Sequence, residues 1–151
     1  MANAPHIRLV LWKAAKAIEK VDLASIAGTG LHLSDFQIME VLLHKGPQPI
    51  NTIGEKVLLT SGSMTAAANR LEKRGMVRRL QDPSDGRCFY VHLTDEGLDV
   101  IKKAYAMHQE NLEKIADVLT TEEREELVRL LKKIGRNAEK VNLSSCHATK
   151  R

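Results

Sequence analysis

Apolar residues recur at spacings of three and four along most of the chain, which predicts a mainly helical protein. A first amphipathic helix is predicted from His6 to about Ile26, before a break at Gly28-Thr29-Gly30. A second helix is predicted to open at Ser34, with a capping box to Gln37. The second helix is apolar almost all round, so we expect it at the centre of a small domain.

Two further short helices are predicted to follow, joined by a tight turn. The first begins at Asn51 or Thr52, and the second has Ser61 as its N-cap and Gly75 as a left-handed C-terminal cap. The second helix has a narrow apolar face made of Met64, Ala67, Ala68 and Leu71. Such a pair, with small and polar residues on the outer face of its second helix, is typical of a helix-turn-helix. A generic helical hairpin has a similar pattern.

The pattern then changes to that of a β-hairpin. Residues 77–81 and 88–93 are rich in strand-forming side chains, and the turn formers of Asp82-Pro83-Ser84-Asp85-Gly86-Arg87 separate them. A helix followed by a hairpin with basic residues is the outline of a winged helix. The alternative is a surface helix and hairpin with solvated charges. A helix followed directly by a basic hairpin favours the winged helix.

A long apolar seam dominates the C-terminal part. Thr94 is predicted to cap a helix whose seam follows an a/d heptad pattern through Leu98, Ile101, Tyr105, His108, Leu112, Ile115 and Leu119. Thr120 is predicted to start a last helix with a capping box to Glu123. The seam is longer than one small domain needs, which indicates packing on a second chain. Packing on the first helix of the same chain is the alternative for part of it.

These elements predict a mainly α fold with a small β-wing. We expect an N-terminal dimerisation helix and loop in residues 1–33 and a winged helix-turn-helix lobe in residues 34–94. C-terminal dimerisation helices are expected in residues 95–143, and a disordered tail in residues 144–151.

Charge is distributed unevenly along the chain of 151 residues, whose formal net charge is +4. The stretch from Ser61 to Leu93 has six Arg or Lys against three Asp or Glu, whereas the stretch from Asp95 to Lys140 has nine against eleven. The positive field therefore lies on the proposed helix and wing, where a nucleic acid would place its phosphates.

Several other classes of protein are disfavoured. The sequence has no apolar run long enough for a membrane span and opens on no secretory segment, so we expect a cytoplasmic protein. It has no phosphate-binding glycine loop, nucleophile elbow or paired-carboxylate constellation, so we expect no enzyme, no catalytic residue and no cofactor. Neither the histidines nor Cys88 and Cys146 have metal-ligand spacing, so no metal is expected. His108 is expected to be a core or interface residue.

Three segments carry a resemblance to the MarR family of transcription regulators. They read LHLSDFQIMEVLLHKGP, LTSGSMTAAANRLEKRGMVRR, and DPSDGRCFYVHLT leading into DEG. The resemblance covers almost the whole chain and implies a homodimer built from the N- and C-terminal helices. It also implies two winged lobes on the double-stranded DNA of a palindromic operator, and repression relieved by a small aromatic effector.

The resemblance also implies where DNA is contacted. Arg87 matches the wing arginine that enters the minor groove, with Asp85 as the carboxylate that orients it. A planar, permanently charged guanidinium suits that narrow groove. The basic residues Lys73 and Arg78 are further candidates. The recognition-helix candidates are Ser61, Ser63, Thr65, Ala66, Asn69 and Arg70. Because the middle of the helix is alanine-rich, we expect sparse base readout, with DNA shape carrying more of the specificity.

Two residues have alternative roles. Cys88 lies beside the cation of Arg87, which favours a thiolate, so a thiol-based redox switch is an alternative to an inert strand cysteine. Trp12 is a candidate for the effector pocket, or a residue that fills core space. A winged-helix module that binds proteins and no DNA is the remaining alternative, and the basic wing argues against it.

Overall fold

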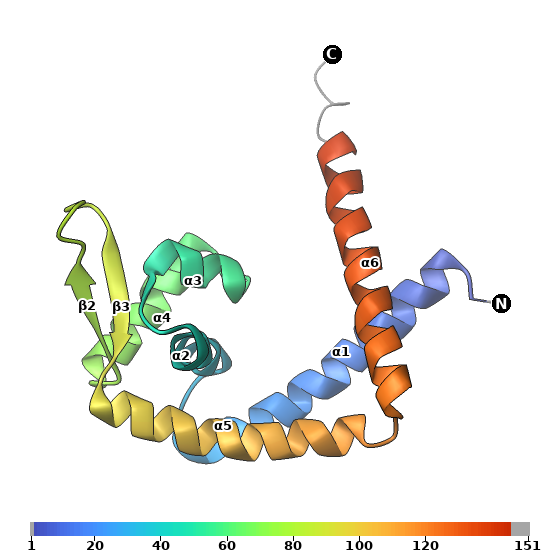
Figure 1. Ribbon diagram of the computed structural model, residues 1–151, viewed down its shortest axis with the longest axis horizontal. Helices are drawn as coiled ribbons and strands as arrows, with labels where there is room; N and C mark the ends of the chain where they lie inside the picture. Colours follow the sequence, from blue (N-terminus) through green and yellow to red (C-terminus); the bar gives the residue numbers. More distant parts are fainter. Residues whose placement is uncertain (1, 146–151) are drawn as a thin grey trace. The chain divides into compact units, whose positions relative to one another are not determined.

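The computed structural model describes residues 2–145, and the chain forms two compact units, residues 1–112 and 113–151. The first unit begins with α1 (Ala4–Ile26), which a short 3-10 turn (Ala27–Thr29) ends. Then follow α2 (Leu33–Lys45), α3 (Ile50–Lys56) and α4 (Ser61–Lys73), grouped beside a hairpin (Figure 1). The long helix α5 (Asp95–Ala116) follows the hairpin and continues into the second unit, which contains α6 (Thr121–Ser145).

The sheet has three antiparallel strands in the order β1-β3-β2. The hairpin consists of β2 (Val77–Gln81) and β3 (Phe89–Leu93), whose register pairs Val77 with Leu93 and Gln81 with Phe89. The two-residue strand β1 (Gln48–Pro49) pairs with β3 and was not predicted. It ties the start of α3 to the base of the hairpin. The predicted fold class, mainly α with a small β-wing, is confirmed.

Most helix boundaries agree with the sequence patterns, with two corrections at the caps. The N-cap of α2 is His32 and not Ser34, because the Asp35 carboxylate accepts the backbone N–H of His32 at 3.3 Å. The N-cap of α4 is Thr60 and not Ser61, because the Thr60 hydroxyl accepts the backbone N–H of Ser63 at 3.2 Å. The C-terminal cap at Gly75 is confirmed by its φ of +71°.

Smaller shifts occur at other ends. α1 begins at Ala4 instead of His6, and α3 begins at Ile50 instead of Asn51 or Thr52. Strand β3 begins one residue after the predicted Cys88, because the backbone N–H of Cys88 closes the tip turn on the carbonyl of Asp85. Helix α6 extends to Ser145, and the rest of the predicted tail, with Cys146, lies outside the described residues.

One hydrophobic core joins α2, α3, α4 and the sheet to the first half of α5. Its centre is formed by side chains that are almost fully buried: Phe36, Ile38, Met39, Ile53, Ala68, Leu71, Val91 and Ile101. Ile101 of the heptad seam therefore packs within the chain, in the core of the lobe. His108, also in the seam, is buried and packs edge-on against Phe36 with ring centroids 4.8 Å apart. Its Nδ1 lies 3.7 Å from the carboxylate of Asp22.

The turn between α5 and α6 is fixed by polar contacts within the second unit. The Arg124 guanidinium donates to Glu113, Ala116 and Asp117 at 2.8 to 3.2 Å. The predicted capping box is confirmed, because Thr120 and Glu123 exchange backbone-to-side-chain hydrogen bonds. Among the helices of residues 2–145, none combines the length and the hydropathy that a membrane span requires.

Candidate nucleic-acid interface

Helix α4 is held against the core by a stripe of small and apolar side chains. Met64, Ala67, Ala68 and Leu71 are all buried. Because α-helical positions three and four apart share a face, Ala66, Asn69 and Lys73 lie together on the opposite side, where all three are exposed. The alanines of the buried stripe let α4 pack closely while its outer face stays free for a ligand.

A hollow of about 390 Å³ lies between α3 and α4 on this part of the lobe. Ser61 and Thr65 of α4 line it, together with Asn51 and Glu55 of α3. Sequence reasoning missed the two α3 residues, although their spacing of four at the start of a short helix places them on one face. The hollow provides both donors and a carboxylate acceptor beside the first turn of α4.

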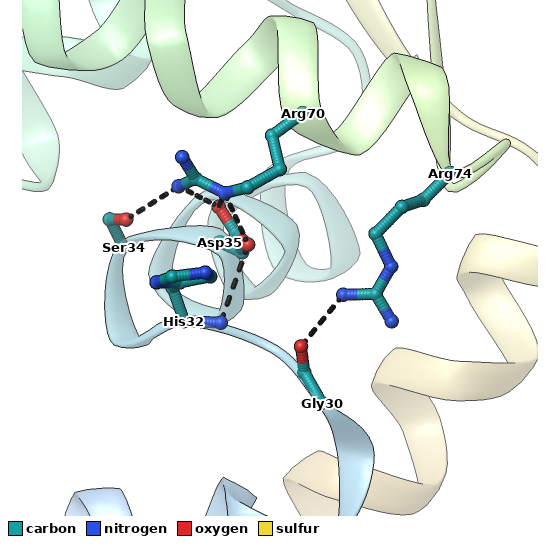
Figure 2. A network of polar contacts seen from close by, with 6 residues as sticks. All are labelled: Gly30, His32, Ser34, Asp35, Arg70 and Arg74. Carbon is teal, nitrogen blue, oxygen red and sulfur yellow. Dashed lines mark hydrogen bonds and ion pairs between the residues drawn. The ribbon is translucent and has the colours of Figure 1, made fainter.

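One flank of α4 is tied to α2 by a buried ion pair (Figure 2). The Arg70 Nε donates to the Asp35 carboxylate at 3.0 Å, and its Nη2 also reaches that carboxylate and the Ser34 hydroxyl. Asp35 is completely buried, whereas the Arg70 side chain is 35% exposed. The hydrogen bond to Asp35 raises the pKa of Arg70, against the opposing effect of desolvation. The guanidinium predicted to contact DNA is therefore engaged inside the lobe.

The next turn of α4 makes a second contact on the same flank. The Arg74 Nη1 donates to the carbonyl of Gly30 at 2.9 Å, and its Nη2 to that of Thr29 at 3.4 Å. Both carbonyls belong to the connection between α1 and α2, which turns at Gly30 with a φ of +67°. Figure 2 shows Arg74 extending toward Gly30 of this connection, whereas Arg70 extends toward Ser34 and Asp35 of α2.

The other flank of α4 is tied to the hairpin. The Arg79 Nε donates to Glu72 at 3.0 Å, and its Nη2 donates both to Glu72 and, at 2.7 Å, to the side-chain oxygen of Asn69. The hydrogen bonds from Arg79 lower the pKa of Glu72 below its ordinary value. The bond from Arg79 to Asn69 orients the Asn69 amide, one of the predicted base-reading groups.

The tip of the wing is ordered by side chains that bond to nearby backbone. Asp82 accepts the N–H and the hydroxyl of Ser84, which lowers the pKa of the Asp82 carboxyl. Asp85 accepts the backbone N–H of Arg87 at 3.0 Å and lies 3.8 Å from its guanidinium. The Arg87 side chain is 97% exposed. The turn therefore presents a solvent-exposed cation at the end of the hairpin.

Comparison with known proteins identifies the family. A sequence profile of the MarR family matches residues 31–89. The HTH-type transcriptional regulator MhqR of Bacillus subtilis is 33% identical over 130 residues, which cover 86% of this chain and 90% of MhqR. The chain belongs to the MarR family. It is a DNA-binding transcriptional regulator with a winged helix-turn-helix, and not an enzyme.

Solved structures agree with the MarR fold. A MarR variant from E. coli complexed with operator DNA superposes with a TM-score of 0.77 at 21% identity, covering 87% of this chain and 94% of that one. NadR in complex with 4-hydroxyphenylacetate superposes with a TM-score of 0.75 at 24% identity, covering 89% and 93%. At these identities the two structures establish the winged helix-turn-helix arrangement.

Within this MarR fold, most predicted DNA-contacting residues are exposed on one helix and its wing. They are Ser61, Ser63, Thr65, Ala66, Asn69 and Lys73 on α4, Arg78 on β2, and Asp85 and Arg87 at the wing tip. Arg70 differs, because its guanidinium faces Asp35. Contact of each residue with DNA stays a prediction.

The other predicted functional residues lie apart from this surface. Trp12 is 56% exposed on α1. A second hollow, of about 340 Å³, is lined by α1, the α1–α2 connection and α5, and Trp12 is not among its lining residues. Cys88 is partly buried at the base of the tip turn. Among residues 2–145, no group of three His, Cys, Asp or Glu side chains is placed to hold a metal ion.

Proposed function

We propose that this MarR-family regulator is a cytoplasmic homodimeric repressor that binds a palindromic operator and is released by a small aromatic effector. One observation carries the proposal. The exposed face of α4 and the 97% exposed Arg87 are held on one lobe by the Glu72–Arg79 pair. A helix of this kind fits the major groove while the wing arginine reaches an adjacent minor groove.

Double-stranded DNA is the favoured partner because the charges suit its backbone. Lys73 and Arg78 are exposed near the outer face of α4 and its wing, and neither forms an ion pair within residues 2–145. Such free cations lower the free energy of binding by releasing counterions from DNA phosphates. The MarR variant that superposes on this chain was crystallised with operator DNA.

Dimerisation is supported by apolar side chains that the described chain leaves uncovered on two helices. On α6 the apolar residues recur at heptad spacing and are 41 to 58% exposed: Leu127, Leu130, Leu131, Ile134 and Val141. On α1 the exposed set includes Ile7, Val10, Leu11, Trp12 and Ile18. Exposed apolar faces that continue along a helix are typical of protein–protein interfaces. We therefore assign residues 1–33 and 95–143 to dimerisation and residues 34–94 to DNA binding.

An aromatic effector is the proposed releasing signal, since NadR has the same fold and was crystallised with 4-hydroxyphenylacetate. The hollow between α1 and α5 is mostly apolar and has Lys103 at its edge, so it suits a small aromatic acid. Trp12 does not line this hollow. It would contact an effector only in a different pocket, one that a partner chain completes on α1.

The test begins with a duplex that the wild-type protein selects from a random pool. We expect the selected sequence to be an inverted repeat, and its affinity to exceed that of a shuffled duplex by anisotropy titration. Salicylate or a quinone should release the DNA. Release by a thiol oxidant that Cys88→Ser abolishes would favour the redox alternative. Equal, weak binding to both duplexes would favour a protein-interaction module.

The dimer is tested separately by sedimentation velocity. Leu131→Asp places a charge on the apolar face of α6 and should give monomers, because an unpaired charge is costly to bury at an interface. Arg136→Asp is the matched control, since position 136 lies on the opposite side of the helix. A dimer that survives Leu131→Asp would remove α6 from the proposed interface.

A further inference from the structure

Two arginines, Arg70 in α4 and Arg74 at its C-cap, point away from the surface that the DNA proposal uses. Arg70 and Arg74 are four residues apart, so they share one flank of the helix. Their guanidinium groups contact Asp35, the start of α2 and the α1–α2 connection (Figure 2). The neighbouring Lys73 lies on the outer face, is exposed and has no ion pair within residues 2–145.

The Arg70 contact is rigid. Asp35 has no exposed surface, and its carboxylate accepts both the fork of Arg70 and the backbone N–H of His32. Two parallel N–H···O bonds between a guanidinium and a carboxylate fix both distance and angle. The middle of α4 is therefore set at one angle to the first turn of α2.

The Arg74 contact fixes a second point. Its guanidinium donates to the carbonyls of Gly30 and Thr29, which follow the C-terminal end of α1. Two contacts one turn apart determine the direction of a helix axis, which a single contact cannot do.

We propose that Arg70 and Arg74 are positioning residues for operator binding, which set the angle of α4 from the α1–α2 connection and do not contact DNA. This inference rests on the proposed DNA-binding role of α4. It separates the basic residues of α4 into two groups. Lys73 binds phosphate, whereas Arg70 and Arg74 determine whether the outer face of α4 meets the base edges in register.

Salt dependence distinguishes these two roles. Each phosphate contact releases counterions, so removing one makes the plot of log affinity against log salt less steep by about 0.9. Loss of a positioning residue leaves the phosphate contacts in place. Such a loss lowers the affinity for the matched duplex. It leaves both the salt slope and the affinity for unmatched DNA unchanged.

The experiment compares Arg74→Gln with Lys73→Gln in the full chain. Anisotropy titrations use the duplex selected by the wild-type protein and a shuffled duplex, over a series of potassium chloride concentrations. For Arg74→Gln we expect affinity for the selected duplex to fall about tenfold. Its affinity for the shuffled duplex and its salt slope should match the wild type. Lys73→Gln should weaken both duplexes equally and flatten the slope.

Arg70 needs a different variant, because removing it alone leaves the Asp35 carboxylate buried without its partner, which is strongly destabilising. The double variant Asp35→Asn/Arg70→Gln removes both charges, and thermal melting establishes that it is folded at the assay temperature. We expect it to lose preference for the selected duplex with an unchanged salt slope.

Two results would overturn the proposal. A flatter salt slope for Arg74→Gln would make Arg74 a phosphate contact. Unchanged affinity for the selected duplex, with only a lower melting temperature, would make both arginines purely structural. If instead the wild-type protein itself did not prefer the selected duplex, the proposed function would fail, and this would be visible before any variant is made.

Discussion

A Cβ atom on Gly97 would lie 1.9 Å from the carbonyl oxygen of Met76, so the start of α5 touches the backbone at the start of the hairpin. The same carbonyl accepts the backbone N–H of Thr94 at 3.1 Å, and the Thr94 hydroxyl both accepts the N–H of Gly97 and donates to the carbonyl of Gly75. These contacts join the end of α4, both strands of the wing and the first turn of α5. They relate the DNA-binding lobe to the helix that carries the seam.

Gly97→Ala should therefore be strongly destabilising. The added methyl group meets backbone atoms that no side-chain rotation can move aside, so we expect a loss of about 3 kcal/mol or more in the free energy of unfolding. Gly62→Ala is the matched control, because a Cβ there has no atom within 4 Å and alanine is the better helix former. Urea denaturation measures both. Equal stability of the two variants would contradict the close approach.

Leu58→Gly should stabilise the fold. Leu58 lies in the turn between α3 and α4 with a φ of +57° and is 92% exposed, so it has backbone strain without compensating burial. Glycine adopts this conformation freely, although its unfolded state has a larger conformational entropy. We therefore expect a net gain of about 0.5–1 kcal/mol in the free energy of unfolding. Leu58→Ala removes the same side chain but keeps the strain. A gain for alanine equal to that for glycine would show that strain is not the cause.

Sequence patterns predicted the elements of this fold well because its helices are set by local signals. The apolar spacings, the cap at Gly75 and the capping box of Thr120 and Glu123 depend on neighbours within one turn. The N-cap of α4 was placed one residue late because Thr60 and Ser61 are both good cap residues. Only the backbone angles of the turn decide between two such neighbours.

The parts that were missed depend on residues far apart in the sequence. Strand β1 has only two residues, one of them proline, and it exists because β3 offers an edge to pair with. The partner of Arg70 lies 35 positions earlier, so the sequence pattern did not reveal that its guanidinium pairs with Asp35. Long-range partners of this kind appear only once the helices are packed.

The Glu72–Arg79 pair should make part of the stability depend on pH. Its hydrogen bonds lower the pKa of Glu72 from an ordinary value of 4.5, so its contribution is present above pH 4.5 and is lost as the pH falls through the lower pKa of the folded state. Glu72→Gln should therefore be less stable than the wild type at neutral pH, by about 1 kcal/mol or less because both side chains are partly exposed.

That difference should shrink as the pH is lowered below 4.5, which denaturation at several pH values would measure. Glu55→Gln is the control, an exposed glutamate on α3 that forms no ion pair within residues 2–145. A difference for Glu72→Gln that does not change with pH would show that the pair does not titrate as described.

Arg87→Ala should weaken operator binding by about 1–3 kcal/mol, which is about five- to 150-fold in affinity. The side chain is 97% exposed, and within residues 2–145 its ion-pair partner is Asp85 alone, so its removal should leave the melting temperature and the dimer unchanged. Arg87→Lys keeps the charge but not the planar fork that suits a narrow minor groove, and should recover only part of the affinity.

Arg136→Ala removes an exposed cation from α6, outside the proposed DNA-binding surface, and should bind like the wild type. Anisotropy with the selected duplex compares all three, and an Arg87→Ala variant that binds as tightly as Arg136→Ala would remove the wing from the mechanism.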